Sequence, residues 1–122
     1  MISIKRLFRS FCDAWHGLVY VWKNEQNFQI QVLVAVLVLI AMIYFRPRKY
    51  EIIVLLILIV SVLTMELMNT ALEYLADLFK PRLHPYVGLI KDIMAGAVLL
   101  TSIGAFIIGI IILAPYFVSL IK

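Results

Sequence analysis

The sequence contains a single cysteine, Cys12, so the chain can form no internal disulfide. It has no long repeat and no low-complexity linker, which indicates one domain at most. Two familiar nucleotide-binding motifs, G-x-x-x-x-G-K-[ST] and G-x-G-x-x-G, are both missing. Neither a P-loop nor a glycine-rich dinucleotide site is therefore expected.

Charged residues are scarce, at 15% of the chain, and three long segments contain none. These uncharged segments run from Gln26 to Phe45, from Ile52 to Met65 and from Ile93 to Ile121. Hydrophobic residues make up 65% of the chain and mean hydropathy is +1.06, whereas soluble domains are about 45–50% apolar. A spanning helix needs about 20 residues. We therefore expect an all-α integral membrane protein with three transmembrane helices.

The expected elements fill one domain, residues 1–122. The transmembrane helices are expected at about residues 26–45, 50–79 and 87–114. Pro47 ends the first of them, and Pro115 is expected to bend or end the third, because proline lacks an N–H and clashes with the preceding helical turn.

Residues 3–22 are expected to form an amphipathic helix. Its polar side chains, including Lys5, Arg6 and Arg9, fall within about 100° of one another around the helix axis, and Phe and Trp side chains gather on the opposite side. A basic face opposite an aromatic face is typical of a helix that lies in the membrane surface.

Four polar residues interrupt the second apolar run at steps of three, four and four: Glu66, Asn69, Glu73 and Asp77. At about 100° per helical residue they fall within a stripe roughly 80° wide. Three carboxyl groups and an amide on one face of a membrane helix are costly unless a metal, a proton or a substrate compensates their desolvation.

The length of this run places the stripe in the membrane. The segment from Ile52 to Met65 spans only about 21 Å at 1.5 Å per residue, whereas the hydrocarbon core is about 30 Å thick. The helix must therefore carry Glu66 into the membrane. Glu73 is expected near the interface, and Asp77 beyond it.

Basic residues indicate the orientation. With three spans, the N-terminus and the loop after the second span share a side. That side holds more than half of the 11 Lys and Arg residues, namely Lys5, Arg6, Arg9, Lys23, Lys80, Arg82 and Lys91. By the positive-inside rule it is cytoplasmic, so the stripe opens towards the cytoplasm.

All three spans contribute polar residues at this boundary, with Glu25 before the first and Lys91 before the third. Carboxylates hold Mg²⁺ while phosphates supply the remaining ligands, and a poorly solvated carboxylate can accept a proton from an alcohol. These are the parts of a phosphoryl transfer site. On chemistry alone, however, a proton- or cation-coupled transporter or channel subunit is the somewhat favoured interpretation, because carboxylates inside membranes serve that role as well.

The stripe also forms a longer pattern, Glu66-Leu-Met-Asn69-Thr70-Ala71-Leu72-Glu73-x-x-x-Asp77. Other motifs accompany it in order: Trp15-x-Gly17, Asn24-Glu25-x-x-Phe28, His84-Pro85 and Lys91-Asp92-x-x-Ala95-Gly96-Ala97. Together they cover about Arg6 to Ile112, and they resemble the small membrane-embedded bacterial diacylglycerol kinase family, which includes the undecaprenol kinases.

The resemblance implies a homotrimer whose subunits each have three transmembrane helices and an amphipathic surface helix. It implies transfer of the γ-phosphate of MgATP to a lipid alcohol, diacylglycerol or undecaprenol, at the cytoplasmic leaflet of the bacterial inner membrane. By position, Glu66 is expected to be the general base, and Asn69 to orient base and substrate. Glu25 and Glu73 are the expected Mg²⁺ ligands. The expected nucleotide contacts are Arg6, Glu25, Glu73, Asp77, His84, Lys91 and Asp92.

Three positions depart from the family pattern. Asp13 stands where some members have a Tyr near the nucleotide. Gln31 replaces an acidic residue of the best-known Gram-negative form, and Ala95 replaces a small hydroxyl residue there. Because the last two positions lie near the lipid in the family, the lipid preference does not carry over, and the departures favour undecaprenol only slightly.

Overall fold

The computed structural model describes residues 1–79, 82 and 84–122, and of His84 only the backbone. These residues form four helices: α1 (Ile4–Asn24), α2 (Gln26–Phe45), α3 (Lys49–Leu78) and α4 (His84–Ile121). Within the described residues, three stretches are long and apolar enough to cross a membrane, namely Gln26–Phe45, Lys49–Leu78 and Pro85–Ile121. An all-helical protein with three membrane-capable helices is therefore confirmed.

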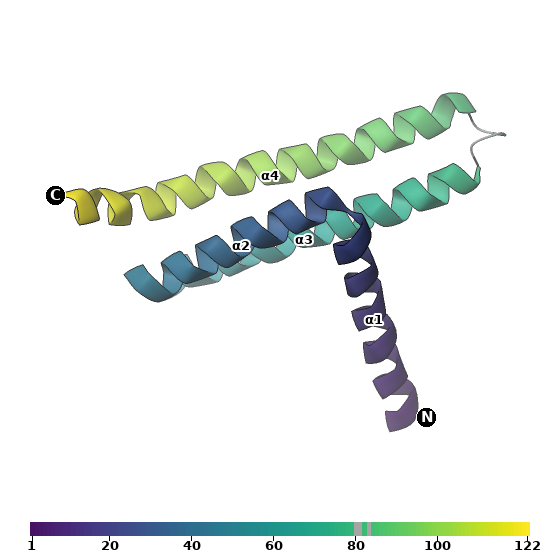
Figure 1. Ribbon diagram of the computed structural model, residues 1–122, viewed down its shortest axis with the longest axis horizontal. Helices are drawn as coiled ribbons and strands as arrows, with labels where there is room; N and C mark the ends of the chain where they lie inside the picture. The colour runs from purple at the N-terminus through teal and green to yellow at the C-terminus, as the bar shows by residue number, and fades with distance from the viewer. Residues whose placement is uncertain (80–81, 83) are drawn as a thin grey trace.

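The helices α2, α3 and α4 run alongside one another, whereas α1 leaves this bundle at a steep angle (Figure 1). Both α2 and α4 contact α3, which is the central element of the chain. Leu55 on α3 is 2% exposed, but most of the large apolar side chains on α4 remain exposed. Such a surface suits helices whose outer faces meet lipid or another membrane helix.

A one-residue corner, Glu25, joins α1 to α2. Its extended backbone, with φ −119° and ψ 110°, ends α1 and precedes the first turn of α2. The Glu25 N–H donates to the Val21 carbonyl at 2.8 Å, and the Gln29 side-chain amide donates back across the corner to the Trp22 carbonyl at 2.6 Å. These bonds fix the backbone that carries the Glu25 carboxylate.

The other end of the bundle has its own polar contact. Arg46 ends α2 in the left-handed conformation, with φ 50°, and donates its N–H to the Met42 carbonyl at 3.0 Å. At the start of α3, the Glu51 carboxylate accepts hydrogen bonds from the Arg48 N–H and the Tyr116 hydroxyl. The Glu51–Tyr116 bond ties the C-terminal part of α4 to the start of α3.

The helix α4 is longer than the expected range of residues 87–114. It begins at His84, with Pro85 in its first turn, where the missing N–H of proline breaks no helical hydrogen bond. It continues through Pro115 to Ile121, so the expected end near residue 114 is wrong. The segment after Pro115 is held against its neighbours by the Tyr116–Glu51 hydrogen bond and by Phe117, whose ring packs on Phe45 at a centroid distance of 4.8 Å.

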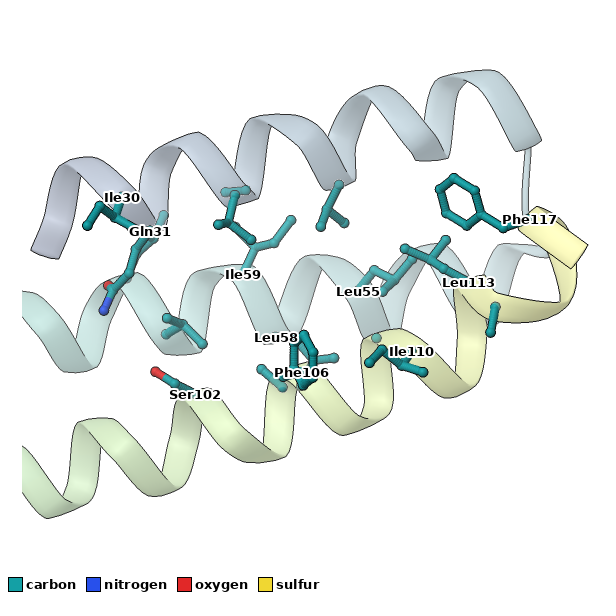
Figure 2. Close-up of a pocket in the computed structure, with 18 of the residues that line it drawn as sticks. Ile30, Gln31, Leu55, Leu58, Ile59, Ser102, Phe106, Ile110, Leu113 and Phe117 are labelled. Carbon is teal, nitrogen blue, oxygen red and sulfur yellow. The ribbon is translucent and has the colours of Figure 1, made fainter.

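A groove with a volume of about 650 Å³ lies between α2, α3 and α4. Its lining is almost wholly apolar, and Gln31 and Ser102 are the lining side chains with polar groups. Figure 2 shows these two side chains near one end of the groove and Phe117 at the other. A Cβ added at Gly109, on the groove wall, would have no neighbour within 4 Å, so this part of α4 is not tightly packed.

Candidate functional site

Glu66 lies on α3 with only 2% of its surface exposed. Its Oε2 accepts a hydrogen bond from the Gln31 side-chain amide on α2, with the nitrogen and oxygen 3.4 Å apart. Gln31 is five residues, or about 8 Å, beyond the start of α2. Glu66 therefore lies opposite the second turn of a membrane-capable helix. Its depth in the membrane stays a prediction.

Buried polar atoms surround this carboxylate. Asn69 and Thr70 are one helical turn further along α3, with exposures of 7% and 2%. The Asn69 amide donates to Oε1 of Glu73 at 3.4 Å, but its carbonyl oxygen has no partner among the described residues. The Thr70 hydroxyl and the Gln31 carbonyl oxygen are also buried without a partner in this part of the chain. Buried polar atoms are nearly always hydrogen-bonded, so three such atoms on α2 and α3 are unusual for a purely structural contact.

Glu25 and Glu73 bring two more carboxylates to the same region. The Tyr74 hydroxyl on α3 donates to Oε1 of Glu25 at 3.0 Å, which connects the α1–α2 corner to α3. Both Glu25 and Glu73 lie close enough to Glu66 to act on its charge electrostatically. These three carboxylates, hereafter the carboxylate cluster, create a negative potential that attracts cations.

Asp77 and Lys91 form an ion pair between α3 and α4. Their side chains are 48% and 33% exposed, so the pair is well solvated and contributes little to stability. Asp77 lies four residues, or about 6 Å, beyond Glu73 along α3. Along α3, the contacts pass from Glu66 opposite α2, through Tyr74 opposite the corner, to Asp77 opposite Lys91 of α4.

Three other expected site residues have no contact with the carboxylate cluster that the described residues establish. Arg6 is exposed on α1, 18 residues or about 27 Å along that helix from Asn24. Asp92 is exposed on α4. The side chain of His84 lies outside the described residues, so its expected role stays a prediction, as do those of Arg6 and Asp92.

Two contacts were not foreseen from the sequence. The Gln31–Glu66 bond had a signal, since a glutamine is polar for a lipid-facing position on a membrane helix. The Tyr74–Glu25 bond had none, because tyrosine is common near membrane boundaries whether or not it has a partner. Both contacts join residues that are far apart in the chain and become visible only when α2 packs on α3.

The carboxylates of the cluster are the candidate metal ligands. Within the part of the chain that the structure describes, no group of three or more His, Cys, Asp or Glu side chains could hold a metal ion. Mg²⁺ in phosphoryl transfer sites, however, is usually bound by only one or two carboxylates, with phosphates and water completing its six ligands. Glu25 and Glu73 supply two carboxylates, and their expected role as Mg²⁺ ligands stays a prediction.

Comparison with known proteins gives one consistent result. A family model described as prokaryotic diacylglycerol kinase matches residues 12–113. The undecaprenol kinase of Bacillus subtilis is 34% identical over 113 residues, which covers 93% of this chain and 92% of the relative. The diacylglycerol kinase of Synechocystis is 36% identical over 115 residues, covering 93% of this chain and 66% of the relative.

A more distant relative, the diacylglycerol kinase of Escherichia coli, is 26% identical over 112 residues and is covered over 92% of its length. The matched residues include the whole polar stripe of α3, the Glu25 corner and Lys91. The chain therefore belongs to the prokaryotic diacylglycerol kinase family.

Proposed function

We propose that the protein transfers the γ-phosphate of MgATP to the hydroxyl group of a membrane lipid, either diacylglycerol or undecaprenol. The observation that carries this proposal is a buried carboxylate, Glu66, beside the polar end of an apolar groove. Membership of a family whose curated relatives are named diacylglycerol kinase and undecaprenol kinase supports a lipid alcohol as the acceptor.

The groove between α2, α3 and α4 is the proposed place for the hydrocarbon chain of the lipid. Its volume of about 650 Å³ is within the range of about 300–1,000 Å³ that is usual for ligand pockets. Because Gln31 and Ser102 lie near one end, an amphiphile would place its alcohol there and its chain towards Phe117. The alcohol would then lie next to Gln31 and the carboxylate of Glu66.

Glu66 is the proposed general base. Its oxygen would take the hydroxyl proton of the lipid as the lipid oxygen forms its bond to the γ-phosphorus and the bond from that phosphorus to ADP breaks. Asn69, one turn away, would orient the base and the substrate. The hydrogen bonds of 3.4 Å at Glu66 and Glu73 are long, as is common in catalytic sites before substrate binds.

Glu25 and Glu73 are the proposed Mg²⁺ ligands, and bound Mg²⁺ would neutralise charge on the phosphates. The corner hydrogen bonds and Tyr74 hold Glu25 in place for this role. Lys91, restrained by Asp77, presents a cation beyond the membrane boundary and is proposed to contact the phosphates. The full set of proposed nucleotide contacts is Arg6, Glu25, Glu73, Asp77, His84, Lys91 and Asp92.

The assembly and placement are proposed as in the family resemblance: a homotrimer in the bacterial inner membrane with its site facing the cytoplasm. Exposed Phe8, Phe11 and Trp15 on α1 support a helix that lies in the membrane surface. Cross-linking in membranes should give a species of three chains. A cysteine introduced at Lys49 should react with an impermeant reagent from outside, whereas Cys12 should not.

The acceptor lipid is the first thing to measure. Purified protein in vesicles, with Mg²⁺ and γ-labelled ATP, should label a lipid alcohol, and we expect a higher kcat/KM for undecaprenol than for diacylglycerol. A preference for diacylglycerol would overturn the choice of lipid. If neither lipid were labelled while solute crossed the vesicle membrane without ATP, the transporter interpretation would replace the kinase.

A further inference from the structure

Gln31 makes a contact that the kinase chemistry described above does not explain. Its amide nitrogen donates to Oε2 of Glu66 at 3.4 Å, and this bond is the polar contact between α2 and the buried carboxylate. Its carbonyl oxygen is buried and has no partner within the residues that the structure describes. The same side chain lines the polar end of the groove (Figure 2). One amide therefore touches both the proposed base and the proposed lipid path.

The amide has a defined effect on a carboxylate. A carboxylate with one oxygen hydrogen-bonded to a fixed donor loses rotational freedom, and its other oxygen is left to accept the substrate proton. A neutral amide adds no charge beside Glu66, where Glu25 and Glu73 already contribute two negative charges. Gln31 thus orients the carboxylate without adding to the repulsion.

We propose that Gln31 is a positioning residue that holds the Glu66 carboxylate towards the lipid hydroxyl, through the hydrogen bond from its amide nitrogen to Oε2. The inference rests on the proposed kinase function. In the resting enzyme, the buried carbonyl oxygen of Gln31 is the acceptor for a water that the lipid hydroxyl displaces. The hydroxyl proton then passes to the free oxygen of Glu66 during transfer.

The test begins with Gln31→Met, which keeps the length of the side chain and removes both polar atoms. Loss of one hydrogen bond to a charged group should lower kcat by about tenfold or more, with the KM for ATP unchanged. Gln26→Met is the matched control, because it removes an exposed amide from the first turn of the same helix. This control should keep the kcat of the unchanged protein.

A second variant, Gln31→Glu, separates positioning from packing. This substitution places a second carboxyl group against Glu66. Among the described residues, Glu25 and Glu73 are the other charged groups that act on Glu66. Two adjacent carboxyl groups share a proton, so the rise of kcat with pH should move to higher pH. At high pH the rate should fall short of that of the unchanged protein, because the donor is lost.

The outcomes are distinguishable. If the unchanged protein labels no lipid, the proposed function fails before Gln31 is tested. If the unchanged protein is active but Gln31→Met keeps its kcat, or Gln31→Glu keeps the original pH profile, the positioning role is overturned. A lower melting temperature with an unchanged kcat per folded molecule would show that Gln31 only fills space, and would also overturn it.

Discussion

Replacing Glu66 by Gln is expected to lower kcat for lipid phosphorylation by about 10²–10⁴-fold, the usual contribution of a general base. The substitution keeps the size and shape of a side chain that is 2% exposed, so no cavity forms. The carbonyl oxygen of the new amide can still accept the hydrogen bond from Gln31. What is lost is the ability to take up the proton of the lipid hydroxyl.

The measurement is the initial rate of label transfer to lipid at saturating MgATP, together with the melting temperature and the oligomeric state of each variant. Glu51→Gln is the matched control: it makes the same change on the same helix, but at the opposite end, where the carboxylate bonds Arg48 and Tyr116. We expect it to keep full kcat. A folded Glu66→Gln protein whose kcat lies within about threefold of the unchanged protein would remove Glu66 from the role of base.

Replacing Glu25 or Glu73 by Gln is expected to raise the Mg²⁺ concentration for half-maximal activity by about tenfold or more. Each change removes one proposed oxygen ligand with its negative charge and keeps the size and shape of the side chain. The KM for lipid should stay within about twofold, because neither residue lines the groove. A titration of rate against Mg²⁺ at fixed ATP measures the first effect, and lipid titration at high Mg²⁺ measures the second.

Tyr74→Phe should change the Mg²⁺ requirement in the same direction as the Glu25 variant, but by less. It removes the hydroxyl that donates to Glu25 at 3.0 Å and keeps the carboxylate. Since one hydrogen bond contributes about 0.5–1.5 kcal/mol, we expect a shift of only about threefold in the Mg²⁺ requirement. Ordinary Mg²⁺ dependence in either the Glu25 or the Glu73 variant would exclude that residue from binding the metal.

The sequence was sufficient to predict features that do not depend on contacts between distant segments. Uncharged runs located the membrane helices, because the hydrocarbon core admits few charges. The short run before Glu66 set its depth, since a helix has a fixed rise per residue. The structure places Gln31 of α2 opposite Glu66, and the depth of both in the membrane stays a prediction. The period of the polar stripe predicted only that its four side chains share one face of the helix.

Contacts between distant segments could not be derived in this way. The partners Gln31 and Tyr74 depend on how α2 and the corner pack on α3, which no local pattern encodes. Pro115 was expected to bend or end the third membrane helix. The helix α4 continues through Pro115 to Ile121, and Tyr116 and Phe117 contact neighbouring helices there. The nucleotide contact expected of Arg6 stays a prediction.

The central claim is that the protein transfers phosphate directly from ATP to a lipid alcohol. Following the γ-phosphate through a single turnover tests this claim most directly. Purified protein in excess over γ-labelled MgATP should be mixed with vesicles that contain undecaprenol or diacylglycerol, quenched at short times and separated into lipid and protein fractions. We expect the label to pass directly into the lipid fraction, with none bound to the protein at any time. Label trapped on a side chain, or label absent from every lipid, would contradict direct transfer to a lipid alcohol.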